Sequence, residues 1–189
     1  MFEPTELQRC QPKLALVTAT AVRLSDGSSA NWRAIESDSC WDLILACGLS
    51  QRQHQKLAEL TELQGVCVAN IETPTADSQA AVNVAEHLLG KLSSRTMPNN
   101  LGVADIRNLI FQAAKLIAFD DMSEALAYLR SNTSTICVGG IYLADVSLSL
   151  STYEQRCQQL ISLMSDAGYL CSTFYPHHNR GCSLLLGFR

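Results

Sequence analysis

Eight cysteines and four histidines are the side chains of this 189-residue chain whose types suit nucleophilic attack, base catalysis or metal binding. Zinc-binding side chains typically occur in closely spaced pairs such as CxxC or CxxH. Neither spacing occurs here, and only His177 and His178 are adjacent histidines. We therefore predict no metal site, and we expect no cofactor.

Most of the cysteines lie in apolar segments. The stretches "ILACG", "GVCVAN" and "ICVGG" contain Cys47, Cys67 and Cys137. Disulfide scaffolds are typical of small secreted chains, whereas the beginning of this chain, "MFEPTELQRCQPK", lacks the basic and apolar stretches of a secretory signal. We predict reduced thiols in a cytoplasmic protein, with Cys137 and Cys182 buried in the core.

Two other groups could carry chemistry, and each has a simpler explanation. His177 and His178 could be bases or metal ligands, but their place in "HHNRG" favours exposed turn residues. Asp120 and Asp121 could form a catalytic carboxylate pair, but acids just before "SEAL" are typical of a helix N-terminus, where the helix dipole favours negative charge.

Composition excludes two classes of partner and predicts one domain. The net charge is -4, and no long run of basic residues occurs, so we expect no nucleic-acid binding. The longest apolar runs are far shorter than the roughly 20 residues that span a bilayer, so we expect no membrane insertion. A hydrophobic content of 47% allows a sizeable core, and we predict a single domain over residues 1–189.

The first half of the chain is predicted to alternate strands with helices. Strands are expected at 13–22 and 42–47 and in "VCVANIE", helices at 51–64 and 80–92, and a short helix or turn around Trp32. Leu57, Leu60 and Leu63 are expected on the buried face of the helix at 51–64, which Gly65 ends. After Pro74, a cap from Thr75, Asp77 or Ser78 is expected to begin the next helix.

In the second half, the segment "IRNLIFQAAKLIAF" fits both the strand and the helix period, and we predict a strand at 108–112 followed by a helix. Asp121 or Ser123 is expected to cap a helix through Leu129, and a strand at 135–142 to end around Gly139-Gly140. Thr152 is expected to cap a helix as far as Gly168, with Leu160, Leu163 and Met164 facing inward. "YLCSTFYP" and "CSLLLGFR" are predicted to pair as a hairpin around "HHNRG". This alternation predicts a layered α/β fold with a mixed sheet.

Several short motifs, in this order, resemble the N-terminal half of a ketosynthase. They are the strand and turn in "VTATAVRLSDGSS", Trp32-Arg33-Ala34, Pro98-Asn99, Leu129-Arg130-Ser131, Val138-Gly139-Gly140, Phe174, Arg180-Gly181 and the strand at 182–186. The resemblance implies a thiolase-like half domain in which Gly139, Gly140, Arg180 and Gly181 belong to the structural motif. A pair of glycines that ends a strand is also common as a plain turn or close-packing site.

The resemblance implies a ketosynthase that has lost its active site. Counting back from Gly139-Gly140 by the separation usual in the family leads to Ala114, with Gln112 two residues away, and no cysteine lies between Cys67 and Cys137. Neither alanine nor glutamine can form the acyl-enzyme that a thiolate forms. The histidine pair of the family belongs to a C-terminal half that this chain does not contain. These differences resemble the chain-length factors of type II polyketide synthases, here in a truncated form such as aryl-polyene synthesis might use.

A chain-length factor acts through its partner. The resemblance therefore implies a heterodimer or heterotetramer with a catalytic ketosynthase in polyketide or fatty-acid-like synthesis, and indirect contact with the acyl chain on an acyl carrier protein. The candidates for the wall of the acyl tunnel are Met97, Phe111, Gln112, Leu116 and Phe119.

Two alternatives belong to other classes. The segment "FDDMSEALAYLRSNTSTICVGGIYLADV" is also similar to the end of the ligase domain of folylpolyglutamate synthases, which would make the chain a small Rossmann-like enzyme. Against that alternative, the P-loop pattern GxxxxGK[ST] is absent. The chain could also be a catalytically silent scaffold with no relation to acyl chemistry.

Overall fold

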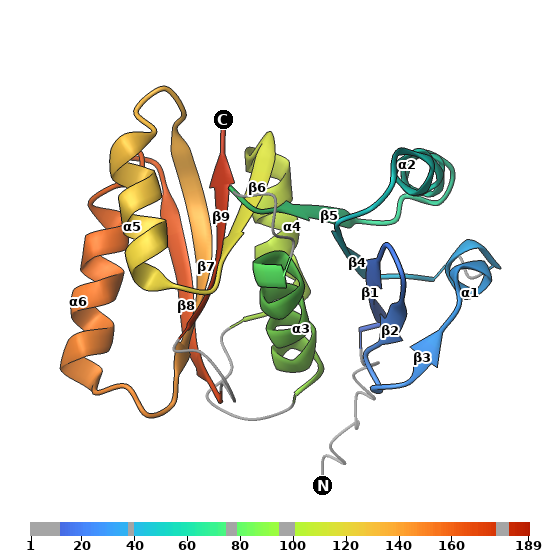
Figure 1. Ribbon diagram of the computed structural model, residues 1–189, viewed down its shortest axis with the longest axis horizontal. Helices are drawn as coiled ribbons and strands as arrows, with labels where there is room; N and C mark the ends of the chain where they lie inside the picture. The colour runs from blue at the N-terminus through green and yellow to red at the C-terminus, as the bar shows by residue number, and fades with distance from the viewer. Residues whose placement is uncertain (1–11, 38–39, 75–78, 95–100, 177–181) are drawn as a thin grey trace, which may run out of the picture.

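The computed structural model describes residues 12–37, 40–74, 79–94, 101–176 and 182–189. Its described strands form one nine-stranded mixed sheet, and helices cover both faces of this sheet (Figure 1). The strand order is β3-β2-β1-β4-β5-β6-β9-β7-β8. The predicted α/β class with a mixed sheet is therefore confirmed. Within the described residues, no helix is long and apolar enough to cross a membrane.

The N-terminal half of the sheet has a parallel centre and an antiparallel edge. Its strands are β1 (Leu14–Thr18), β2 (Val22–Leu24), β3 (Ser29–Ala30), β4 (Leu43–Cys47) and β5 (Val68–Glu72). β1, β4 and β5 are parallel. β2 pairs antiparallel with β1, and β3 pairs antiparallel with β2. The single strand predicted at 13–22 was wrong because a tight turn divides it. The Ala21 amide donates to Thr18 Oγ1 at 3.0 Å, and the Thr18 amide donates to the Ala21 carbonyl at 2.8 Å.

The C-terminal half of the sheet consists of β6 (Lys115–Phe119), β9 (Cys182–Phe188), β7 (Cys137–Asp145) and β8 (Tyr169–Tyr175). β9 runs antiparallel between β6 and β7, and β8 pairs in parallel with the other side of β7. The predicted hairpin of the last two strands was therefore wrong, because β7 lies between them. All seven residues of β9 are buried. A strand that is buried at every position, and apolar except at Ser183, suits the middle of a sheet covered on both faces.

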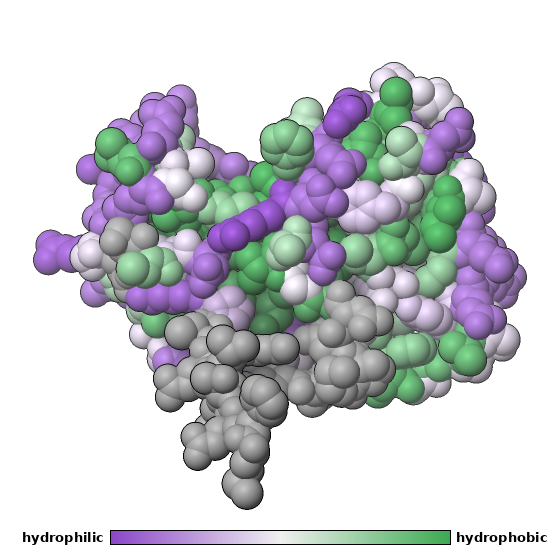
Figure 2. All heavy atoms as spheres, turned by 180° about the vertical axis from the view of Figure 1, so that it is seen from behind, coloured by the Kyte–Doolittle hydropathy of each residue, from purple (hydrophilic) through white to green (hydrophobic). Residues whose placement is uncertain are grey.

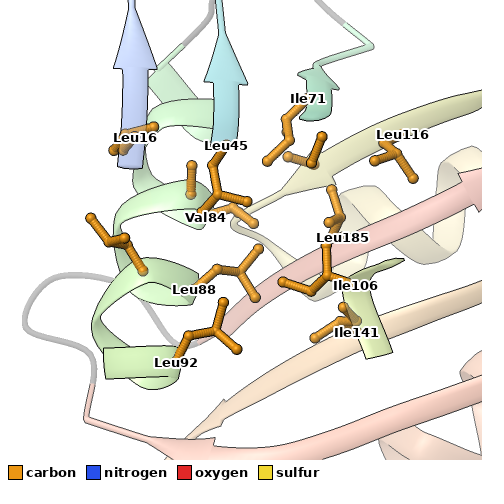
Figure 3. Packing of buried hydrophobic residues seen from close by; sticks show 14 of the residues in the cluster. Leu16, Leu45, Ile71, Val84, Leu88, Leu92, Ile106, Leu116, Ile141 and Leu185 are labelled. Carbon is orange, nitrogen blue, oxygen red and sulfur yellow. The ribbon is translucent and has the colours of Figure 1, made fainter. Parts of the chain in front are cut away.

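The two halves meet at a narrow junction. β5 and β6 are joined by only two residue pairs, Ile71 with Leu116 and Glu72 with Ile117. Two helices, α3 (Gln79–Ser93) and α4 (Val103–Gln112), cover one face across this junction. Figure 3 shows Leu16 and Leu45 of the first half near Val84, Leu88 and Leu92 of α3, and Leu116, Ile141 and Leu185 of the second half near Ile106 of α4. This shared core makes the two half-sheets one structural unit.

The opposite face carries two separate cores. Over the first half, α1 (Trp32–Ser37) and α2 (Gln51–Gln64) pack on β1 and β4. Over the second half, α5 (Met122–Ser131) and α6 (Leu150–Ile161) pack on β6, β7 and β9. Figure 1 shows these two helix pairs at opposite ends of the sheet.

The predictions of strand β4 and of helices α1, α2 and α3 are confirmed, with α3 at 79–93 against the expected 80–92. Gly65 ends α2 in the left-handed conformation, with φ +67°. Leu57 and Leu60 are buried, but Leu63 is 83% exposed. At 100° per residue, Leu63 lies about 120° around the helix from Leu57, outside the apolar stripe. The expected caps Thr75, Asp77 and Ser78 lie outside the described residues.

The order of strand and helix predicted for "IRNLIFQAAKLIAF" is reversed. Residues 103–112 form α4, and residues 115–119 form β6. The N-terminal turn decides this, because the Gly102 amide donates to Asp105 Oδ2 at 2.7 Å. Ile106 and Leu109 are then buried at helical spacing, and Phe111 faces outward.

Three boundaries near the C-terminus also differ from expectation. β7 continues to Asp145, so Gly139 and Gly140 lie inside the strand rather than at its end. By contrast, α5 begins as expected: Asp121, one of its two predicted caps, accepts from the Glu124 amide at 2.9 Å. α6 begins after Ser149, whose hydroxyl accepts from the Thr152 amide at 3.2 Å, and it ends at Ile161 rather than near Gly168.

Candidate functional site

The positions where the resemblance places the lost nucleophile lie at the end of a helix. Gln112 is the last residue of α4; its side-chain amide donates to Asn108 Oδ1 at 3.1 Å, and its carbonyl accepts from Arg189 Nε at 2.6 Å. The Ala114 amide donates to the Phe188 carbonyl at 2.8 Å. Neither residue belongs to a strand of the sheet.

The residues proposed for a tunnel wall do not share one surface. Phe111 is 89% exposed on α4. Leu116 and Phe119 are buried on opposite faces of β6, in the shared core and in the α5–α6 core. Met97 lies outside the described residues. Phe111 and the neighbouring Gln112 are therefore the described members of the set that stand at the surface.

Gly139 and Gly140 are close-packing positions. A Cβ atom on Gly139 would lie 2.9 Å from the Tyr169 ring, and one on Gly140 would lie 2.6 Å from Leu186 Cδ2. Contacts this short leave no room for a methyl group, so packing accounts for both glycines. Arg180 and Gly181, the other positions of the predicted structural motif, lie outside the described residues, as do His177 and His178.

Burial suppresses the reactivity of the core cysteines. Desolvation raises the pKa of Cys47 and of Cys182 to about 12, and the pKa of Cys137 to about 11. It also raises the pKa of Cys171 to about 11. A thiol attacks as the thiolate, so these four groups are poor nucleophiles near neutral pH. Within the residues that the structure describes, no group of three or more His, Cys, Asp or Glu side chains is arranged to hold a metal ion.

A stripe of polar residues on α3, which the sequence reasoning missed, faces the C-terminal half of the sheet. Gln79, Asn83, His87 and Lys91 recur every four residues, so they lie on one side of the helix. We call these four residues the α3 polar stripe. Their spacing inside an otherwise apolar helix was the available signal, but their partners come from strands far away in the sequence.

Gln79 donates to Asn83 Oδ1 within the α3 polar stripe at 2.9 Å, and the other three members reach a strand residue or the residue just after a strand. Asn83 Nδ2 donates to the buried Asp120 at 2.9 Å, and Lys91 Nζ donates to the Phe174 carbonyl at 3.1 Å. His87 Nδ1 lies 2.7 Å from Ser183 Oγ. A serine hydrogen-bonded to histidine can be an activated nucleophile, but Ser183 is only 1% exposed, so no substrate reaches its hydroxyl. The stripe therefore fixes α3 to the ends of β6, β8 and β9.

A crevice of about 340 Å³ opens beyond the carboxyl ends of β4 and β5. The chain leaves β4 toward α2 on one face of the sheet and leaves β5 toward α3 on the other, and diverging exits of this kind form the ligand crevices of α/β sheets. Its polar lining consists of His54, Asn70, Glu72 and Thr73. Glu72 also forms an ion pair with Lys115, in which Oε2 and Nζ are 2.9 Å apart. A small polar molecule would fit this volume and lining.

The last strand of the sheet has an open outer edge. β8 pairs with β7 over seven consecutive residue pairs, and no described residue pairs its backbone with the other side of β8. The sequence of β8, "YLCSTFY", contains no charged residue, proline or glycine. Proteins usually protect exposed edge strands with charge, proline, bulges or short length, because such edges pair readily with other strands.

The space-filling view from behind shows apolar side chains among the polar ones at the surface (Figure 2). Among the described residues, the large apolar side chains that are more than half exposed are Leu63, Phe111, Ile136, Val146, Leu150 and Ile161. Five of these six belong to the C-terminal half or to α4 beside it, the half that ends in β8.

No protein-family model matches the chain, and no curated protein matches it. Among solved structures, the chain is similar to the FtsZ W319Y mutant of M. jannaschii, with 13% sequence identity and a TM-score of 0.37. The match covers 83% of this chain and 54% of that one, so this chain spans about half the length of that protein. A likeness of this extent carries no inference about function.

Proposed function

We propose that the protein is a non-catalytic subunit that binds a partner protein by adding a partner strand to the edge of β8. The observation that carries this proposal is the open edge itself, which is seven residues long and uncharged. Strand addition satisfies the outward backbone groups of an edge strand and selects partners through the alternating side chains.

The protonation and burial of the reactive groups support a non-catalytic role. The thiols of Cys47, Cys137 and Cys182 have pKa values of about 11 to 12, so almost none of each is thiolate near neutral pH. The Ser183 hydroxyl, which His87 contacts, is buried. The nucleophiles that the structure places in the core serve packing.

The sequence resemblance makes a catalytic ketosynthase the partner to test first, and this choice of partner rests on the sequence motifs alone. In this form of the proposal, the protein is a chain-length factor, and the edge of β8 forms its interface with the ketosynthase. Phe111, exposed beside the C-terminal end of α4, is then the residue of the predicted tunnel set best placed to touch a partner. An acyl carrier protein would meet the complex through the ketosynthase.

Co-purification tests this proposal. The full chain would be co-expressed with a ketosynthase that carries its cysteine and both histidines, and the complex would be isolated through a tag on the ketosynthase. Ser172→Lys should abolish the complex, because it places a charge in the middle of β8, whereas Ser172→Ala should preserve it. Both substitutions remove the hydrogen bond that the Tyr153 hydroxyl donates to Ser172 Oγ at 2.6 Å, so their difference isolates the charge.

Three results bear on the form of the complex. Phe111→Ala in an intact complex should lengthen the products, and unchanged products would count against the tunnel role. A ketosynthase that never co-purifies would exclude this partner class. A complex that Ser172→Lys leaves intact would show that β8 is not the binding edge.

The crevice beyond β4 and β5 favours a second candidate function, that of a small-molecule-binding protein of the Rossmann-like class. Its position is where α/β sheets usually hold ligands, and the side chains of His54 and Asn70 line it with polar groups. A panel of nucleotides and small carboxylic acids, screened by thermal shift, tests this function. A ligand that stabilises the protein but not the Asn70→Leu variant would support it, and no shift with any compound would exclude these classes.

A further inference from the structure

We propose that, when no other partner occupies it, β8 pairs antiparallel with β8 of a second copy of this chain, about a two-fold axis at Ser172. The two nine-stranded sheets would then form one continuous sheet. This inference rests on the proposed function in one respect, because it uses the same open edge of β8.

The sequence of β8 is complementary to itself in this arrangement. Ser172 is the middle of the seven residues Tyr169–Tyr175, so the axis places Tyr169 opposite Tyr175 and Leu170 opposite Phe174 of the second copy. Cys171 then lies opposite Thr173. Aromatic and aliphatic pairs are favourable across antiparallel strands, and like charges directly opposite are unfavourable. Every pair in this register is uncharged. The two pairs farthest from the axis, Tyr169 with Tyr175 and Leu170 with Phe174, are aromatic or apolar.

The pairing also extends the core on both faces of the sheet. Tyr169 and Tyr175 pack against the shared core beneath α3 and α4. Leu170 and Phe174 pack against the core beneath α6. Six of the seven β8 residues are only half-buried in one copy. A second β8 would cover the exposed remainder of each side chain with a matching apolar or aromatic one, which removes further apolar surface from water.

The geometry of β8 presents a regular edge. The pairing of β7 with β8 runs from Gly139–Tyr169 to Asp145–Tyr175 without a break, whereas the pairing of β7 with β9 has an irregularity between Cys137 and Gly139. A bulge would twist the edge away from a partner. The opposite edge of the sheet, β3, has only two residues. Length, regularity and lack of charge therefore all select β8 as the strand that pairs.

Side chains from the neighbouring helices hold β8 in place. Lys91 Nζ of α3 donates to the carbonyl of Phe174 at 3.1 Å. α6 lies over one face of the strand, where the Tyr153 hydroxyl donates to Ser172 Oγ and the Tyr153 and Phe174 rings have centroids 4.5 Å apart. These contacts hold β8 in place from its faces, so the strand can accept a partner at its edge without rearrangement.

Introducing a charge at the two-fold axis tests the inference. Position 172 meets itself in the dimer, so Ser172→Lys and Ser172→Glu each place like charges directly opposite one another. Each variant alone should dissociate at least about tenfold more readily than the Ser172→Ala control. An equimolar mixture of the two should recover the dimer, because each Lys then faces a Glu. Sedimentation velocity over a concentration series measures the association, and native mass spectrometry identifies the mixed dimer by its mass.

The mixture separates loss of association from loss of folding. A variant that fails to fold cannot form the mixed dimer, so recovery shows that both chains are folded. If either charged variant has lost its far-ultraviolet circular dichroism spectrum, Ser172→Cys replaces the pair: the two introduced thiols meet at the axis, so oxidation should cross-link the chains, and no cross-linking beyond that of wild type would overturn the inference.

The outcomes for this inference and for the ketosynthase proposal are distinct. Wild-type protein that stays monomeric at its highest attainable concentration overturns self-pairing, whether or not a ketosynthase binds. A dimer that both charged variants retain also overturns it, because another surface must then carry the contact. A β8 dimer that no ketosynthase disrupts or joins leaves self-pairing standing and excludes the ketosynthase partner.

Discussion

Replacing Gly90 of α3 by alanine should destabilise the protein, although alanine is the better helix former. In an exposed helix this substitution would stabilise by about 0.5–1 kcal/mol. Here the new Cβ would overlap the hydroxyl oxygen of Tyr175 at the end of β8, and it would lie 3.2 Å from Cζ of the same ring. Forcing a methyl group into such a contact typically costs about 1–3 kcal/mol. We therefore expect Gly90→Ala to lower the free energy of unfolding by up to about 2 kcal/mol.

A double-mutant cycle isolates this overlap. Tyr175→Phe removes the hydroxyl, so in that background Gly90→Ala should recover most of the helix gain, and the stabilities should couple by about 1–3 kcal/mol. The cycle subtracts whatever else Tyr175→Phe changes, including the contact of the ring with His87, whose centroid lies 5.7 Å away. Urea unfolding of the four proteins, followed by circular dichroism, gives the four free energies.

The sign of the single substitution decides whether the reasoning holds. If Gly90→Ala stabilises the wild-type background as much as the Tyr175→Phe background, α3 does not pack against the end of β8 as described. The α3 polar stripe would then lose its structural explanation, because the bond from Lys91 to the Phe174 carbonyl depends on the same approach of the helix and the strand.

Three further predictions follow from individual sites. Gly140→Ala should lower the free energy of unfolding by about 1–3 kcal/mol because its Cβ would meet Leu186. Gly102→Ala, whose Cβ would lie 3.8 Å from Asp105 Oδ2, should lower it less, and equal effects in urea unfolding would contradict the close-packing explanation. Desolvation lowers the pKa of Lys91 in the folded state. Charged Lys91 therefore reduces the free energy of unfolding below that pKa, and this loss of stability fades as the pH rises toward the ordinary value of 10.5. Any advantage in stability of Lys91→Met over wild type should shrink between pH 8 and pH 10.5, and unfolding curves in which the advantage grows would contradict a lowered pKa. Finally, iodoacetamide at pH 8 should modify the exposed Cys40 much faster than Cys47 or Cys182, because burial raises the pKa of both these thiols to about 12. Peptide mass mapping measures the labelling of each cysteine. Rapid labelling of Cys47 in the folded protein would show that its burial is transient.

Local signals in the sequence were sufficient for elements whose pattern admits one period. The helix at 51–64 was predicted to the residue because an amphipathic stripe and a terminal glycine agree. β4 was predicted from a short, continuous apolar run, and Asp121 was one of the two caps expected for α5. The segment at 106–119 was reversed because its apolar residues fit both periods, and only the capping bond between Gly102 and Asp105 settles the choice.

Candidate sites were harder to predict than elements. Cys137 and Cys182 were correctly expected in the core, since apolar neighbours in sequence usually mean apolar neighbours in space. The α3 polar stripe was missed because Asp120, Ser183 and the Phe174 carbonyl reach α3 only through the order of the strands. The tunnel set was assembled along the sequence, and alternation along β6 then placed Leu116 and Phe119 on opposite faces.

By itself, the sequence determined the α/β class, most helix boundaries and the burial of the thiols, because these depend on periodicity, caps and side-chain polarity within a few residues. Only the tertiary structure decided that β9 enters between β6 and β7, and this insertion leaves β8 rather than β9 at the edge. Strand order depends on contacts between segments that are far apart in the sequence, because backbone hydrogen bonds can join any two strands in the same way. The open edge on which the proposed function depends is therefore a consequence of topology rather than of any motif.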